Sequence, residues 1–124
     1  MILIVGGTAQ GKLDYVLDKT GLGRDAVARN PDAAKEKPIF DGLADWVRVH
    51  PDTALDELLD ANPDVIIICD EVGCGVVPVA PEERAWREAV GRLCCRLAER
   101  AARVERVFCG LGMVLKGEGQ WRSY

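Results

Sequence analysis

The feature that most constrains the fold is an unbroken apolar stretch, Val-Ile-Ile-Ile-Cys, at residues 65–69. Four of these five residues are β-branched, which favours a strand, and no polar residue marks a side that faces solvent. A strand that is apolar on both faces lies in a sheet that helices cover on both sides. Residues 1–5, Met-Ile-Leu-Ile-Val, form a second stretch of this kind. The sequence therefore predicts a parallel sheet with both stretches buried in it, the later one in a central position.

Helical periodicity separates these strands from the rest of the chain. Apolar residues recur at helical spacing in residues 12–19, 51–61 and 81–103, and the last of these is the longest predicted helix. The remaining expectations are a short helix broken by Pro31 within residues 24–37, a short strand at 38–43, a stretch at 46–50 that is either strand or irregular, and a last strand region at 104–115 interrupted at Gly110 and Gly112. The alternation predicts an α/β fold with a parallel sheet of four or five strands and flanking helices.

Length and charge narrow the class of protein. A chain of 124 residues fits a single compact domain over residues 1–124, in which we expect the tail, residues 117–124, to be flexible. A net charge of −4 argues against a nucleic-acid partner. No apolar run approaches the roughly 20 residues of a membrane span, and the apolar start is too short for a signal peptide. We therefore expect a cytoplasmic protein.

The segment after the first strand has the form of a phosphate-binding loop. Four residues separate Gly6 from Gly11, Lys12 follows, and a helix is predicted to begin there, which is the context that this motif requires. The main-chain N–H groups of such a loop converge on phosphate oxygens, and the lysine reaches the outer phosphates. Leu13 stands where a serine or threonine usually ligates Mg²⁺, a position that water can fill. The predicted nucleotide-binding residues are Gly6, Gly7, Thr8, Ala9, Gln10, Gly11, Lys12 and Leu13, with Lys12 also catalytic; the alternative is a glycine-rich turn that binds no anion.

Two acidic residues follow the central strand. Asp70 and Glu71 lie where that strand ends, and ligands bind at the carboxyl ends of strands in open parallel sheets. Both are predicted metal ligands for Mg²⁺, and Glu71 is also a predicted catalytic residue. Because adjacent residues of a strand point to opposite faces, we expect only one of them to face the phosphates.

The spacing of the cysteines and of the single histidine is not typical of a metal site. Five cysteines without a Cys-x-x-Cys pair do not suggest a disulfide framework or a zinc site. The neighbours Cys94 and Cys95 allow a redox role, although simple packing in the long helix is the alternative that we favour. His50 is expected in a surface loop, with a role as base or nucleotide acceptor as the less favoured alternative.

Residues 70–78, Asp-Glu-Val-Gly-Cys-Gly-Val-Val-Pro, resemble the signature N-E-V-G-x-G-I-V-P of the adenosylcobinamide kinase / adenosylcobinamide-phosphate guanylyltransferase family of cobalamin biosynthesis. The family's opening G-G-x-x-S-G-K-S is similar to the start of this chain at Gly6, Gly7, Gly11 and Lys12. Its ending G-L-x-x-x-L-K is matched at Gly110, Leu111, Leu115 and Lys116. The chain differs in being shorter between the first helix and the central strand, where the family has its guanylylated histidine.

The resemblance implies a fold and an activity. It implies a P-loop NTPase sheet of the RecA-like type and a homo-oligomer, with the trimer as the family's assembly. It also implies GTP or ATP with Mg²⁺ as cofactor and a corrinoid small molecule as the second ligand. The missing histidine segment favours kinase-type phosphoryl transfer to the corrinoid over guanylyl transfer. Leu13 and the same missing segment leave one alternative open, a catalytically degenerate regulator or accessory subunit that binds a nucleotide or a corrinoid.

Overall fold

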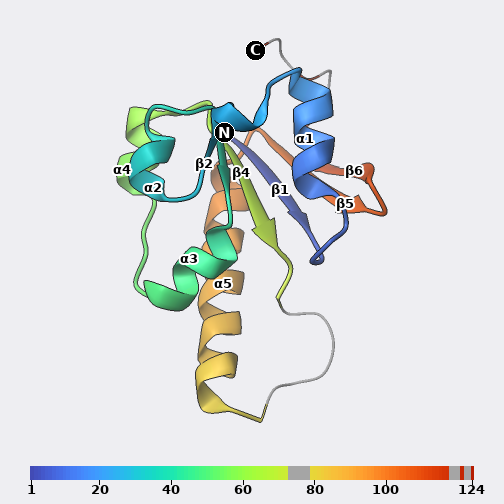
Figure 1. The fold of residues 1–124 in the computed structure, drawn as a ribbon. Helices are drawn as coiled ribbons and strands as arrows, with labels where there is room; N and C mark the ends of the chain where they lie inside the picture. The colour runs from blue at the N-terminus through green and yellow to red at the C-terminus, as the bar shows by residue number, and fades with distance from the viewer. Residues whose placement is uncertain (73–78, 118–120, 122–123) are drawn as a thin grey trace.

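A single six-stranded sheet organises the computed structural model, which describes residues 1–72, 79–117, 121 and 124 (Figure 1). The strand order is β2-β3-β4-β1-β5-β6, and every neighbouring pair is parallel except β5 and β6. This arrangement confirms the expected α/β class with a mainly parallel sheet. The strands are β1 (Ile2–Gly6), β2 (Val27–Ala28), β3 (Ile39–Asp41), β4 (Ile66–Asp70), β5 (Arg103–Phe108) and β6 (Leu111–Lys116).

The two apolar stretches occupy the middle of the sheet, as expected. β4 lies between β3 and β1, and the side chains of its first four residues are buried. β1 and β4 run in register, with Ile2 opposite Ile66 and Gly6 opposite Asp70. Their carboxyl ends are therefore level, so the loop that follows β1 begins beside the acidic residues that end β4.

Helices cover both faces of the sheet. On one face, α1 (Lys12–Thr20) packs through Val16 on the even-numbered residues of β1 and β4. On the other face lie α3 (Leu43–Val49), α4 (Asp56–Ala61) and the long α5 (Pro81–Arg100), which Figure 1 shows on the side of the sheet away from α1. Among the described residues, no helix is long and apolar enough to cross a lipid bilayer.

Several expected elements differ in the structure. Residues 46–49 belong to the helix α3 and His50 is its C-cap, because Leu43, Ala44 and Val47 are spaced to bury one helical face against the sheet. The helix expected from residue 51 begins at Asp56, after a turn in which the Thr53 hydroxyl donates to the carbonyl of His50. The helix expected to run to residue 103 ends at Arg100.

The stretch at residues 24–37 holds more structure than expected. It contains a 3-10 turn, η1 (Arg24–Ala26), the short edge strand β2, and α2 (Pro31–Ala34). Pro31 does not break a helix but begins one, at the position where proline is well tolerated. The side chain of Asn30 caps this helix by accepting a hydrogen bond from Ala33 N–H at 2.8 Å.

The last strand region is a β-hairpin rather than one interrupted strand. Cys109 and Gly110 have φ angles of 52° and 74°, which make the tight turn between β5 and β6. β6 therefore runs antiparallel to the rest of the sheet as its edge strand, making six strands where four or five were expected.

Two expectations concern residues beyond the described part. Most of the signature at 70–78 and much of the tail at 117–124 lie outside the described residues. Within the tail, Trp121 packs against Tyr15 of α1, with ring centroids 6.2 Å apart in an edge-to-face arrangement.

Candidate functional site

The predicted phosphate loop leaves β1 at a position where only glycine fits. A Cβ on Gly6 would lie 2.5 Å from the main-chain oxygen of Val107 in β5, which is closer than a Cβ atom comes to a backbone oxygen in proteins. On its other side, Gly6 accepts a hydrogen bond from Glu71 N–H at 2.8 Å. The first residue of the loop is therefore fixed between its two neighbouring strands.

The loop then turns into the N-terminus of α1. Ala9 and Gly11 have positive φ angles of 59° and 84°, and Gly11 is the N-cap residue of the helix. No side chain caps this helix end. The first N–H groups of a helix have no partner within the helix, and together with the helix dipole they favour an anion. The backbone here has the form that the sequence predicted for a phosphate-binding loop.

Lys12 lies at the centre of the predicted site. Its side chain is only 7% exposed, and its ammonium group is 2.6 Å from Asp70 Oδ1 and donates to the Gly7 carbonyl at 2.8 Å. The Thr8 hydroxyl is 3.4 Å from the other Asp70 oxygen. Lys12 and Thr8 of the predicted loop and Asp70 after the central strand are thus brought together. In this arrangement Asp70 neutralises the charge of Lys12.

Glu71 points away from this group, as the alternation of strand residues predicted. Its carboxylate forms a bidentate ion pair with Arg106 of β5, in which Nε lies 2.9 Å from one carboxylate oxygen and Nη2 lies 3.1 Å from the other. Glu71 therefore lies on the α5 side of the sheet and Asp70 on the α1 side. The pair joins β4 to β5 across β1, the strand from which the loop starts.

A cavity of about 380 Å³ opens beside Lys12 and Asp70. Ala9, Gly11 and Leu13 line it from the loop and α1. Leu13 also packs against the apolar cluster under α1 and brings no oxygen to the site. Five charged residues that line the cavity were not predicted as site residues, namely Asp14, Arg24, Arg29, Asp41 and Asp45.

Of these, Asp41 had a signal in the sequence. It ends β3 just as Asp70 ends β4, and it faces the same side of the sheet. Its side chain is 18% exposed and pairs with Arg29 at 2.9 Å. The rule that ligands bind at the carboxyl ends of strands applies to it equally. Arg24 and Arg29 lie in the segment whose structure the sequence left least defined.

The helix that follows the loop is anchored by a buried carboxylate. Glu105 of β5 is 1% exposed and accepts hydrogen bonds from the Tyr15 hydroxyl of α1 and from Arg103 Nε. Burial, followed by the hydrogen bond to Glu105, raises the pKa of Tyr15 to about 12. This network fixes α1, and with it the loop, to the sheet.

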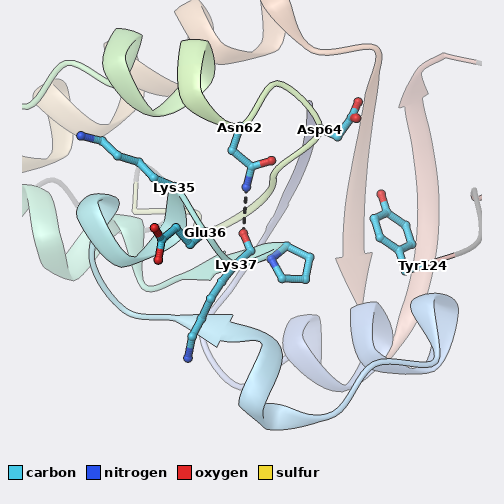
Figure 2. Close-up of a pocket in the computed structure, with 7 residues that line it drawn as sticks. Lys35, Glu36, Lys37, Asn62, Asp64 and Tyr124 are labelled. Carbon is cyan, nitrogen blue, oxygen red and sulfur yellow. Dashed lines mark hydrogen bonds between the residues drawn. The ribbon is translucent and has the colours of Figure 1, made fainter.

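A second hollow of about 440 Å³ lies at the opposite end of the sheet (Figure 2). Lys37 and Asp64, which line it, precede β3 and β4 and therefore lie at the amino ends of these strands. The amide nitrogen of Asn62 donates to the carbonyls of Ala34 and Lys37, so this side chain ties two loops together. Because ligands of parallel sheets bind at the carboxyl ends, the Lys12 cavity is the better candidate for the functional site.

Among the described residues, no cysteine lines that cavity, and neither does His50. Cys94 contacts not its neighbour Cys95 but Cys69 of β4, with the sulfur atoms 3.6 Å apart. This contact and burial raise the pKa of the Cys69 thiol. His50 stacks on Trp46 with ring centroids 3.8 Å apart and is exposed at the end of α3.

The sheet order, the glycine-rich loop and the buried lysine define a P-loop NTPase-type α/β domain. Residues 27–115 match the family model described as cobinamide kinase / cobinamide phosphate guanyltransferase, and the chain belongs to this family. A relative is the "Bifunctional adenosylcobalamin biosynthesis protein CobP" of Pseudomonas aeruginosa, which is 41% identical over 66 residues. That match covers 52% of this chain and 38% of the relative, so the aligned part is well under half of the relative's length.

Proposed function

We propose that this protein is a nucleotide-dependent transferase of cobalamin biosynthesis that binds GTP or ATP, with Mg²⁺, at residues 6–13. The observation that carries the proposal is the buried Lys12 ammonium, which is 2.6 Å from Asp70 beneath the uncapped N-terminus of α1. A phosphate chain at this point would replace Asp70 as the partner of Lys12 and would accept hydrogen bonds from the loop amides. Membership of the family supports the same class of ligand.

Each predicted residue has a role in this proposal. Lys12 neutralises the charge that develops on the transferred phosphoryl group, and the amides of residues 7–13 orient the phosphates. Asp70 balances the positive charge of Lys12 in the protein without a nucleotide. The arrangement supplies positioning and charge, which are the main requirements of phosphoryl transfer.

The donor set fits Mg²⁺ bound together with a nucleotide. The described residues hold no group of three or more histidine, cysteine or acidic side chains that would bind a metal alone. Mg²⁺, however, usually takes one or two carboxylates and completes its shell with phosphates and water. Asp70 would hold it, with Asp41 in the same cavity as a second oxygen ligand. Glu71 remains in the proposal as the second acidic residue, but it would first have to leave Arg106.

We propose further that the acceptor is a corrinoid and that the transfer is of the kinase type. The cavity beside Lys12 offers the reacting end of the acceptor a place next to the loop. Guanylyl transfer through a histidine is less well supported, because the chain's one histidine, His50, does not line this cavity and stacks on Trp46.

We also propose a cytoplasmic homo-oligomer, with the trimer as one candidate. The support is the edge strand β6, on which Leu111, Met113 and Leu115 expose between 56% and 74% of their surface. Apolar side chains that gather in this way on an edge strand are usually covered by another chain.

Calorimetric titration with GTP and ATP, with and without Mg²⁺, tests the proposal. We expect binding that Lys12→Ala and Lys12→Met abolish, because both remove the ammonium group and the second keeps the apolar stem. The matched control is Lys19→Ala, which removes an exposed lysine from the last turn of the same helix and should bind like the wild type. Equal binding by the Lys12 variants, with folding verified by thermal unfolding, would contradict the proposal.

One observation favours the second candidate, a regulator or accessory subunit without turnover. The side chain of Leu13 packs into the apolar cluster under α1, at the position where a hydroxyl would ligate Mg²⁺. Incubation with adenosylcobinamide and either nucleotide separates the two candidates. Phosphorylated product that depends on Lys12 supports the enzyme, whereas nucleotide binding without product supports the regulator.

A further inference from the structure

We infer that the turn of the β5–β6 hairpin is a working part of the phosphate loop and that Gln10 is the positioning residue that holds the two together. The inference rests on the proposed function, because it concerns the same loop. The loop motif explains phosphate binding through main-chain groups, whereas here the side chain of Gln10 helps to hold those groups in position.

Gln10 binds two consecutive amides of the turn. Its side-chain Oε1 accepts from Cys109 N–H at 2.8 Å, and its main-chain oxygen accepts from Gly110 N–H at 2.9 Å. A Cβ placed on Gly11 would be 3.5 Å from the Cα of Gly110, so the two backbones also lie in close contact. One residue of the loop therefore joins it to a segment 99 residues further along the chain.

The position of Gln10 in the loop gives this contact its importance. It lies between Ala9 and Gly11, which both have positive φ angles. For alanine this backbone conformation is uncommon, and it persists only where the surrounding structure holds it. The main-chain bond of Gln10 fixes the peptide group between Gln10 and Gly11, whose amide would face a phosphate, and the side-chain bond fixes Gln10 itself against the turn.

The expected effect is on ligand affinity more than on folding. Gln10 is half-buried and Cys109 is exposed, so water can replace the side-chain bond at small cost to stability. A loop that is no longer held in its binding conformation must be ordered when the ligand arrives, and this ordering lowers affinity. A residue with only a structural role would lower stability and leave affinity unchanged.

Gln10→Met tests the inference, because methionine keeps the length of the side chain and removes the acceptor oxygen. Inorganic tripolyphosphate and GTP serve as the two ligands, measured by calorimetry. We expect both to bind about three- to tenfold more weakly, the factor that corresponds to one neutral hydrogen bond. The midpoint of thermal unfolding should stay within about 2 °C of the wild type. The control is Val49→Ala, which removes an exposed side chain from α3, outside the loop and the turn, and should leave both affinities unchanged.

Amide hydrogen exchange at Cys109 gives a second measurement that needs no ligand. The exchange should be faster in Gln10→Met than in the wild type, because the amide loses its acceptor. An unchanged exchange rate would overturn the bond itself, and unchanged affinity for tripolyphosphate would overturn the positioning role. If the wild type bound neither ligand, the proposed function would fall and the positioning role with it, whatever the exchange rate.

Discussion

Glu105 offers the most direct test of what holds the loop helix to the sheet. Its carboxylate is 1% exposed, and its partner Arg103 is 13% exposed, so the ion pair is largely removed from water. The same carboxylate accepts the hydroxyl hydrogen of Tyr15. Glu105→Ala would leave both groups without this acceptor inside the protein. Removal of one partner from a buried ion pair costs about 3–5 kcal/mol, and we expect a loss near the lower end because Tyr15 is only half-buried.

The expected loss of unfolding free energy in Glu105→Ala is large enough to measure. A domain of this size is stable by about 5–15 kcal/mol, so the substitution should remove a substantial part of the total. In urea, with an m value of about 1–3 kcal/mol/M, a loss of about 3 kcal/mol lowers the midpoint by about 1–3 M. Tyr15→Phe, which removes one hydrogen bond to a charged group, should cost less, about 1–2 kcal/mol.

Urea unfolding followed by circular dichroism is the assay, with equal m values as the condition for comparing midpoints. Glu99→Ala is the matched control, because Glu99 is exposed on α5 and should change stability by less than about 0.5 kcal/mol. If Glu105→Ala lost less than about 1 kcal/mol, the buried pair would contribute little and the argument from burial would be refuted.

Three further predictions concern the same region and the cysteines. The pKa of Tyr15 is raised to about 12 in the folded protein, so on raising the pH the unfolded chain loses this proton first. Stability should therefore fall between about pH 10 and pH 12. Urea midpoints measured across that range should show this fall in the wild type, and Tyr15→Phe should remove the part due to Tyr15. Gly112→Ala should lower stability and abolish the late titration of Tyr15 in ultraviolet absorbance, because the added Cβ would lie 2.0 Å from the Tyr15 hydroxyl. Oxidation by diamide, which takes two electrons and two protons from a pair of thiols, should form a disulfide between Cys94 and Cys69, whose sulfur atoms are 3.6 Å apart. Mass spectrometry of a proteolytic digest identifies the disulfide, and a Cys94–Cys95 disulfide would show the prediction to be wrong.

The local parts of the fold could be predicted because their signals are local. The strand β4 has an apolar sequence on both faces, and the glycines around Lys12 have no other common explanation than a tight loop. The helix α3 was missed because Val47 and Val49, which favour strands in isolation, lie beside Trp46. Packing of its apolar face against the sheet outweighed this preference. Asn30 and Pro31 are a typical helix start, a capping residue followed by proline at the first helical position, so the expectation of a helix broken at Pro31 was wrong.

The site was predictable only to the extent that the topology was. The divergence of Asp70 and Glu71 follows from strand geometry alone, and the structure confirms it. That Arg106 would meet Glu71 depends on β5 lying beside β1 in a particular register, which no local pattern encodes. The contact of Gln10 with the hairpin turn depends in the same way on a pairing across 99 residues of sequence.

These long-range contacts bear on how the loop can lack a hydroxyl after Lys12. The loop is held at its start, where Gly6 is fixed between β4 and β5, and in its middle, where Gln10 binds the hairpin turn. At its end, α1 is tied to β5 through Tyr15. None of these three contacts involves Leu13. These three contacts hold the loop without Leu13, so under the proposed function the leucine would remove a metal ligand and leave in place the backbone that we propose to bind phosphate. Phosphate affinity should accordingly survive at this site even where dependence on Mg²⁺ is weak.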